Sequence, residues 1–419
     1  MTPLLETDDT QAREGARKIA FARKRMPVLA RVEAELAERR PLAGERIAAC
    51  LHVTTETANL CRALVAAGAE VALCASNPLS TKDDVASALA GSDGIAVHAL
   101  NGSSLEELRA GMDAVLDTEP TLLVDDGADL TAIVHTRRVD LAPGIRAAAE
   151  VTTAGVQRLR SMDAGGVLRF PVVPVNDAQT KHLFDNRYGT GQNTIDGILR
   201  ATNVLLAGSV FVVVGFGWCG RGVAARARGM GARVVVCEVD PIKVLEAVLE
   251  GYEVLPVLDA AELGDVFVTV TGNRHAIPLD ALRRMKSGAV VANSGHFDLE
   301  IDVEGLRTAA VERHVPRRNV EELVLVDGRE IVLLAEGRLV GQACAEAHPA
   351  AVMDMSFATM ALAVEHLAAH AGSLAPGLHP LPAAIEERVA RLKLEALGIR
   401  HDTLSTEQEA YVASWEVGS

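Results

Sequence analysis

Short apolar runs alternate with helix-compatible segments along most of the chain. A charged segment over about 10–38 has a helical pattern, and so do residues 56–67. Strand-like apolar runs lie at 47–53, 70–75, 94–100 and 121–124. Strands that alternate with helices form parallel sheets covered by those helices, so this part of the chain predicts a βαβ succession.

A second set of apolar runs begins at Val210. Its strands are predicted at 210–214, 233–237, 266–271 and 289–293. A hairpin follows, formed by 323–326 and 330–334, with Asp327-Gly328 at its turn. The two sets predict an α/β fold of two doubly wound, Rossmann-like domains with a cleft between them.

Segments outside the two sets are helical in pattern. A polar connector, Asn176 to Asn203, joins them, and a long helical pattern runs from His348 to His370. After a break rich in proline and glycine at 376–382, the chain is charged and helix-compatible again. We therefore expect a helical C-terminal tail.

The strand at 210–214 leads directly into a glycine-rich loop, Gly215-Phe216-Gly217-Trp218-Cys219-Gly220. In the G-x-G-x-x-G pattern the first glycine permits a tight turn, the second admits a pyrophosphate, and the third allows close packing of helix on strand. The next strand ends in Glu238, where an acidic residue holds the ribose hydroxyls of NAD. This context favours a dinucleotide site over a purely structural turn.

The composition indicates a globular protein and argues against nucleic-acid, metal and membrane binding. Hydrophobic residues make up 49% of the 419 residues, and the formal net charge of −15 argues against nonspecific nucleic-acid binding. The six cysteines form no C-x-x-C pair and no metal-binding cluster with histidine, so we expect free thiols, a cytoplasmic location and no metal. No secretory signal is evident, and no apolar run reaches the roughly 18 residues of a membrane span, so no membrane association is expected.

Polar residues gather just after the predicted strands, where α/β sheets bind ligands. The four groups are His52 to Glu56, Asp125 to Asp129, Asn176 to Asn186, and Gly295 to Asp298. Lys181 and Asp185 are four residues apart and share one face of a helix, where a lysine beside a carboxylate serves as a base. Each group also has a structural interpretation: a surface ion pair for Lys181 and Asp185, a turn at Asp126, and packed histidines at 52 and 296.

Several long segments resemble one family. These are LHVTTETANL, NPLSTKDDVA, DDGADLT, NDAQTKHLFDNRYGTGQ, GFGWCGRG, EVDPIK, GHFDLEIDV, LLAEGRL and HPAAVMDMSF. They are similar to S-adenosylhomocysteine hydrolase, the NAD-dependent adenosylhomocysteinase family, over almost the whole chain. The sequence of the glycine loop, GFGWCGRG, and the last residues, 415–419, resemble the shorter branch of the family found in archaea and some bacteria. That branch lacks a C-terminal extension that reaches a neighbouring subunit in the longer branch.

The resemblance implies a redox cycle without net oxidation. NAD oxidises the 3′-hydroxyl of the nucleoside, the resulting ketone acidifies the C4′ hydrogen, homocysteine leaves C5′, water adds, and the ketone is reduced again. The implied domains are a substrate-binding domain at 1–185, completed by about 345–380, an NAD-binding domain at 186–344, and a tail at 381–419. A homotetramer acting on a small-molecule adenine nucleoside thioether is also implied.

The resemblance also implies a role for each site residue. Lys181 and Asp185 would handle the 3′-hydroxyl proton, Asp126 the C4′ proton, and His52 the leaving thiolate and incoming water. His296 would line the cleft near the ribose. The substrate-binding residues would be Thr54 and Glu56 at the adenine edge, with His348 at the hinge. The NAD contacts would be Thr152, Thr153, Asn186, Gly215, Gly217, Gly220, Glu238 and Asn293.

Three positions depart from the family pattern. Where the family has two glutamates, three threonines and a glycine, this chain reads Glu150-Val151-Thr152-Thr153-Ala154-Gly155. The second glutamate, placed at the substrate ribose, is thus Val151, and one threonine is Ala154. The asparagine expected near the nicotinamide carboxamide is Gly341.

These departures leave three functional hypotheses open. The first is an adenosylhomocysteinase, with slower turnover because Val151 lacks a hydrogen bond to the ribose. The second is a paralogue that performs 3′-oxidation chemistry on a modified adenine nucleoside. The third is a catalytically weak protein that binds NAD and nucleosides in a regulatory role.

Overall fold

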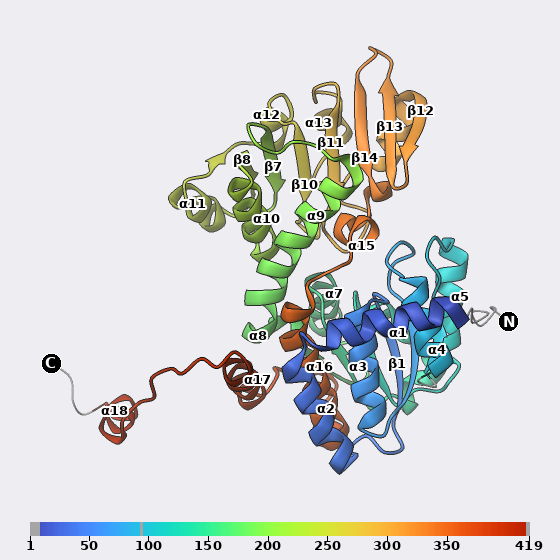
Figure 1. Cartoon of the computed structure of the whole chain (residues 1–419), viewed down its shortest axis with the longest axis vertical. Coiled ribbons are helices and arrows are strands. Elements are labelled where there is room, and N and C mark those ends of the chain that lie inside the picture. The colour runs from blue at the N-terminus through green and yellow to red at the C-terminus, as the bar shows by residue number, and fades with distance from the viewer. Residues whose placement is uncertain (1–8, 93–94, 416–419) are drawn as a thin grey trace.

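Two helix-covered sheets form the body of the protein, one above the other in Figure 1. The structure, a computed structural model, describes residues 9–92 and 95–415. The chain builds most of the lower unit first, crosses to build the upper one, and returns. This arrangement confirms the predicted α/β fold with two Rossmann-like sheets.

The lower sheet has seven parallel strands in the order β15-β6-β5-β4-β1-β2-β3. They are β1 (Arg46–Leu51), β2 (Glu70–Ala75), β3 (Ala96–His98), β4 (Leu122–Asp125), β5 (Ala147–Glu150), β6 (Pro171–Pro174) and β15 (Gly377–Leu378). The apolar runs predicted β1 to β4, although Gly94 of the third run lies outside the described residues. Strands β5 and β6 were not predicted, because β5 is built mainly of alanine and β6 is a pair of valines with a proline on each side, and alanine and proline are both depleted in strands.

The upper sheet has eight strands in the order β12-β13-β14-β11-β10-β7-β8-β9. Six neighbouring strands, β14, β11, β10, β7, β8 and β9, are parallel, and β13 and β12 continue one edge as antiparallel strands. They are β7 (Val210–Val214), β8 (Arg233–Cys237), β9 (Glu253–Val254), β10 (Val266–Thr269), β11 (Ala289–Asn293), β12 (Ala310–Arg317), β13 (Val320–Leu325) and β14 (Glu330–Leu334).

Helices cover both sheets. Around the lower sheet they are α1 (Asp9–Arg23), α2 (Pro27–Arg39), α3 (Thr55–Ala66), α4 (Asp83–Ser92), α5 (Leu105–Leu116), α6 (Asp129–Thr136) and α7 (Thr153–Ala164). Around the upper sheet they are α10 (Trp218–Gly229), α11 (Pro241–Leu249), α12 (Val257–Ala261), α13 (Leu279–Leu282) and α14 (Val303–Ala309). The single helix predicted at about 10–38 is two helices, because Pro27 begins a new helix at its first position.

The two units are joined by two connectors. The outgoing connector contains α8 (Gln179–Lys181), the π-helix η3 (His182–Gly189) and α9 (Thr190–Thr202). The return connector runs from α15 (Val340–Cys344) to α16 (Ala350–His370), which packs on β5, α2 and α3 of the lower unit.

Helix α16 bears on the expectation that no apolar run of the sequence is long enough to cross a membrane. By length and composition it is apolar enough to cross a membrane, although 67% of the critical window is buried inside the protein. Its buried polar residues are satisfied within the fold: Asp354 accepts from Lys393 at 2.8 Å, and Ser356 donates to Asp185 at 2.9 Å. These contacts are those of a core helix.

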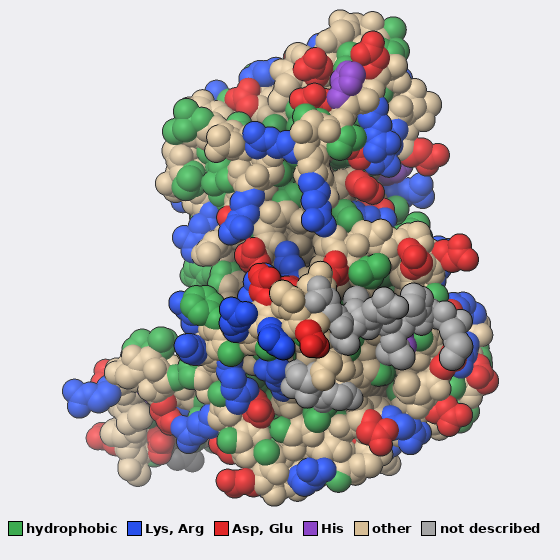
Figure 2. All heavy atoms as spheres, turned by 45° about the vertical axis from the view of Figure 1, so that its right-hand side comes forward, with side chains coloured by type: hydrophobic (Ala, Val, Ile, Leu, Met, Phe, Trp, Pro, Cys, Tyr) green, Lys and Arg blue, Asp and Glu red, His purple; other side chains and the backbone are tan. Residues whose placement is uncertain are grey.

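The C-terminal tail is helical, as predicted, and its end extends away from the body (Figure 1). Helix α17 (Ala383–Ala396) packs on α16 and α2, whereas α18 (Thr406–Val412) has no buried residue. Figure 2 shows acidic and basic side chains interspersed over the face that it draws.

Candidate active site

A large cavity opens where the two units and both connectors meet. Its volume is about 1040 Å³, enough for a dinucleotide together with a small substrate. The carboxyl ends of strands from both sheets contribute to its wall. The predicted site residues that line it are His52, Thr54, Glu56, Asp126, Thr152, Thr153, Lys181, Asp185, Asn186, Gly215, Gly217, Glu238, His296 and His348.

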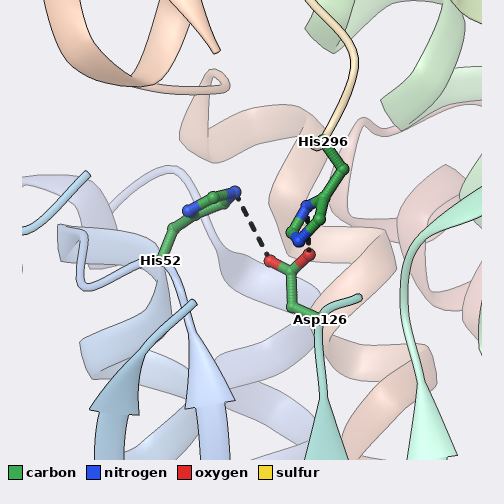
Figure 3. A group of neighbouring side chains, drawn as sticks. All are labelled: His52, Asp126 and His296. Carbon is green, nitrogen blue, oxygen red and sulfur yellow. Dashed lines mark ion pairs between the residues drawn. The ribbon is translucent and has the colours of Figure 1, made fainter. Parts of the chain in front are cut away.

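Three of these side chains converge from both units (Figure 3). His52 and Asp126 follow strands β1 and β4 of the lower sheet, and His296 follows β11 of the upper sheet. Nε2 of His52 lies 3.6 Å from one carboxylate oxygen of Asp126, and Nδ1 of His296 lies 3.4 Å from the other. On its far side, Nδ1 of His52 contacts the hydroxyl of Ser80 at 2.8 Å. The hydroxyl orients the imidazole toward the cavity.

Burial controls the ionisation of this group. It lowers the pKa of His52 to about 3 and also lowers the pKa of His296, so both rings are neutral near pH 7. It raises the pKa of Asp126 above its ordinary value, although the neighbouring His296 and Lys181 oppose this rise. A carboxylate with a raised pKa and neutral imidazoles are suited to proton transfer.

The same three residues form a group whose spacing could hold a metal ion, with ligand atoms within 4.8 Å of one another. No other such group occurs in the part of the chain that the structure describes. The sequence did not suggest it, because His52, Asp126 and His296 are far apart along the chain.

The ion pair between Lys181 and Asp185 is buried rather than exposed. The two residues are 5% and 3% exposed, and Nζ lies 3.5 Å from a carboxylate oxygen of Asp185. Nζ donates to the side-chain oxygen of Asn186 at 2.6 Å. Asp185 also accepts from His348 at 2.8 Å. Burial works against ionisation of Asp185, but Lys181 and His348 hold its pKa below the ordinary value.

Thr54 and Glu56 lie at the start of α3. Thr54 caps the helix, because its side chain accepts from the backbone N–H of Thr57. Glu56 is 6% exposed, and burial raises its pKa. One carboxylate oxygen accepts from Thr55 at 2.8 Å, whereas the other, Oε2, is buried and has no hydrogen-bond partner among the described residues. An unmet acceptor at a cavity wall calls for a donor from a bound ligand.

The glycine loop has the geometry that a dinucleotide requires. Gly215 has a φ of +107°, and a Cβ on Gly220 would lie 2.0 Å from the carbonyl oxygen of Gly215. Beside Gly217, in contrast, no heavy atom lies within 4 Å of an added Cβ, so space is left open at the start of α10. Glu238 follows β8 and accepts from the backbone N–H of Phe216 at 2.7 Å, which ties the loop to the next strand. The residues present therefore fit NAD.

Two predicted cofactor contacts do not line the cavity. Gly220 packs beneath the loop, and Asn293 is fully buried. The side-chain nitrogen of Asn293 donates to three carbonyls, including that of Gly337 at 2.9 Å, and its oxygen accepts from Thr269 at 2.9 Å. With its hydrogen bonds used inside the protein, Asn293 braces the loop after β11.

The departures Val151, Ala154 and Gly341 all line the cavity. The carboxylate of Glu150 turns away from it and accepts from the backbone N–H groups of Gly127 and Ala128 at 3.0 and 2.8 Å. Glu150 therefore supports the loop that carries Asp126. It cannot replace the carboxylate that is missing at Val151.

Sequence reasoning missed several lining residues. Trp218 and Arg221 belong to the glycine loop, and the guanidinium of Arg221 lies 4.6 Å from the Trp218 ring. Gln342 lines the cavity with a buried side-chain oxygen that has no partner among the described residues. Asn193 lines it from α9. The positions between motif glycines carry no general signal, and the connector that carries Asn193 was predicted as helical without an indication of which face lines the cavity.

Comparison with known proteins agrees with this geometry. Residues 6–143 match the family S-adenosyl-L-homocysteine hydrolase, and residues 186–347 match its NAD binding domain. An adenosylhomocysteinase of Aquifex aeolicus is 55% identical over 98% of this chain and 99% of its own length, and one of Thermosynechococcus vestitus is 52% identical over 97% and 94%. An S-inosyl-L-homocysteine hydrolase of Methanopyrus kandleri is 50% identical over 98% and 97%. The chain thus belongs to the S-adenosyl-L-homocysteine hydrolase family and carries that family's NAD-binding domain.

Proposed function

We propose that the protein catalyses the NAD-dependent, reversible hydrolysis of S-adenosyl-L-homocysteine to adenosine and homocysteine through a 3′-keto intermediate. One observation carries this proposal: the glycine loop with Glu238 opens into the same cavity as His52, Asp126 and the Lys181–Asp185 pair. The names of the two adenosylhomocysteinases that match this chain over nearly their whole length support it.

We assign the lower unit, 1–185 with about 345–380, to substrate binding and residues 186–344 to NAD. NAD held by these residues would supply the hydride acceptor for C3′ and the hydride donor for the return step. Gly215 and Gly217 would admit the pyrophosphate, and Glu238 would hold a ribose. We assign the tail at 381–419 to neither of these two domains.

Each step of the proton chemistry has a group placed for it. Lys181, buried and oriented by Asp185 and Asn186, takes the proton of the 3′-hydroxyl as hydride leaves. Asp126 then removes the C4′ proton, which the neighbouring ketone has made acidic. His52, whose Nε2 lies 3.6 Å from Asp126, relays the proton that Asp126 has taken from C4′ to the departing homocysteine sulfur, and passes a proton from the incoming water back to Asp126. His296 holds Asp126 from the other unit.

Glu56 is proposed to read the base. Its Oε2 lacks a donor inside the protein, and the exocyclic amine of adenine would supply one. Hypoxanthine presents an oxygen there instead. The Methanopyrus kandleri relative is named for the inosyl compound, so the adenosyl and inosyl substrates are the pair to compare.

The test is to incubate the purified protein with S-adenosyl-L-homocysteine and follow free thiol, together with near-ultraviolet absorbance of enzyme-bound NADH. Thiol release, faster with the adenosyl than with the inosyl substrate, is the expected result. NADH accumulation without thiol would instead favour a paralogue acting on a modified adenine nucleoside, an alternative motivated by Val151. If neither free thiol nor bound NADH is formed, the result would favour a regulatory protein that binds NAD and nucleosides.

We also propose that the protein is a cytoplasmic homo-oligomer, a tetramer as in its family. None of the six cysteines, all of which lie in the described part of the chain, forms a disulfide, which suits a reducing compartment. Large apolar side chains are exposed on the C-terminal arm, residues 395–415, among them Leu404, Tyr411 and Trp415 at 56%, 58% and 91%. Others lie on and beside α11, including Ile242 and Leu249 at 75% and 88%. Patches of this kind mark protein interfaces, and a second copy of the chain offers both surfaces.

A further inference from the structure

An amide on the outgoing connector occupies the space beside Gly341. Asn193 lies on α9, is 4% exposed and lines the cavity. A Cβ added to Gly341 would lie between 2.4 and 2.7 Å from the three atoms that end the Asn193 side chain, whichever way its amide is turned. Atoms in close-packed proteins do not approach this closely. A side chain at position 341 and the present Asn193 amide therefore exclude one another.

The Asn193 amide also joins two parts of the return connector. When it is oriented so that its nitrogen faces acceptors, Nδ2 donates to the carbonyl of Gly341 at 2.9 Å and to that of Ala347 at 3.2 Å. Ala347 has a φ of +82°, a conformation that residues with a side chain rarely adopt. Such a conformation persists only where the surroundings hold it, and the bond from Asn193 does so.

The residue held in this way is next to His348. Nδ1 of His348 contacts Asp185 at 2.8 Å, and Nε2 faces the hydroxyl of Thr190 at 3.5 Å. Asp185 in turn pairs with Lys181. A continuous series of contacts thus leads from Asn193 to the group that takes the 3′-hydroxyl proton in the proposed reaction.

We propose that Asn193 and Gly341 are an exchanged pair, in which the amide expected at position 341 stands on α9 instead. From there Asn193 acts as a positioning residue that holds His348 against Asp185. Its effect on turnover rests on the proposed function, but its coupling to Gly341 does not.

The experiment is a double-mutant cycle on the holoenzyme, with N193S, G341N and the double variant. N193L retains bulk without the amide and separates hydrogen bonding from space filling. Gln192 is exposed on the same helix, and Gly372 is exposed with nothing within 4 Å of an added Cβ, so Q192S and G372N are matched controls. The readouts are the thermal midpoint, NAD retained after gel filtration, and kcat and KM for thiol release.

Each single variant is expected to lower kcat by about tenfold with a smaller change in KM, and G341N to release NAD. The double variant should recover to within about threefold of the unmodified protein, because contacting residues couple strongly. N193L should behave like N193S. Effects that simply multiply in the double variant, or a fully active N193L, would overturn the proposal.

If G341N cannot be purified, G341A adds only the conflicting Cβ and gives the same test. If the unmodified protein releases no thiol, the proposed function fails, while NAD retention and the thermal midpoint still report the coupling.

Discussion

At the scale of single residues, Val151 changes the chemistry of the cavity most directly. It is 5% exposed and places an isopropyl group where the family resemblance implies a carboxylate at the ribose. The adjacent Glu150 is committed to the loop at Gly127 and Ala128. No carboxylate from this strand end therefore reaches the ligand.

Replacing Val151 with glutamate should accelerate thiol release from S-adenosyl-L-homocysteine by roughly tenfold, the worth of one charge-assisted hydrogen bond. The variant should also be less stable, because the new carboxylate lies near Glu150, Asp125 and Asp126, whose pKa values burial already raises. Steady-state kinetics and thermal unfolding measure both effects. V151M, which adds volume without charge, is the control, and an equal gain in V151M would refute the explanation.

His52 provides a prediction about pH. Its pKa falls from 6.5 to about 3 in the folded protein, mainly through burial. Between these values the unfolded chain binds a proton that the folded chain does not, so stability decreases as pH falls from 6.5 toward 3.

The slope due to one such histidine is about 1.4 kcal/mol per pH unit. H52N retains a polar group beside Ser80 and should flatten the dependence by up to that amount. Urea unfolding of both proteins at several pH values measures the difference, in which the other titrating groups largely cancel. Parallel stability curves would contradict it.

At the scale of elements, the strands and the glycine loop were predictable because their signals are local. Strands β7, β8 and β11 occupy the residues expected from their valine-rich runs. The connector was predictable only as helical. Lys181 is buried at the end of α8 and Asp185 in the π-helix that follows, although their spacing alone also fits a surface pair. Burial depends on packing against α16, a segment far away in sequence, and no local pattern encodes that contact.

The glycine loop allows folding and binding to be separated. Gly217 has a φ of −74° and open space around it, so G217A should fold normally but bind NAD at least about tenfold more weakly, because the new methyl group enters the pyrophosphate space. G220A forces a Cβ against the Gly215 carbonyl and should lower stability by about 1–3 kcal/mol even without NAD.

NAD titration and thermal unfolding of the cofactor-free proteins distinguish the two variants. If both lose stability equally, the loop does not leave cofactor space at Gly217.

At the scale of the whole molecule, the feature that bears on assembly is the exposed C-terminal arm. Every residue from 395 to 415 is exposed, and the arm extends away from both units (Figure 1). The cavity lies elsewhere and includes no residue of the arm.

Removing residues 400–419 should therefore shift the protein to a smaller oligomer while the isolated subunit keeps its fold. Light scattering after gel filtration and circular dichroism measure the two properties. Substituting Leu404, Tyr411 and Trp415 together with serine should reproduce the shift, and E407A with Q408A on the same helix should not. An unchanged molar mass would show that the arm does not mediate assembly.

The order of the strands also has a consequence for how the chain is made. Strand β15 and helix α16, which complete the lower unit, follow the entire upper unit in sequence. During synthesis from the N-terminus, the upper unit can therefore close first, while apolar surface beneath α16 stays uncovered until about the last fifth of the chain emerges. The lower unit is therefore completed last, and its uncovered apolar surface is prone to aggregation until α16 has been synthesised.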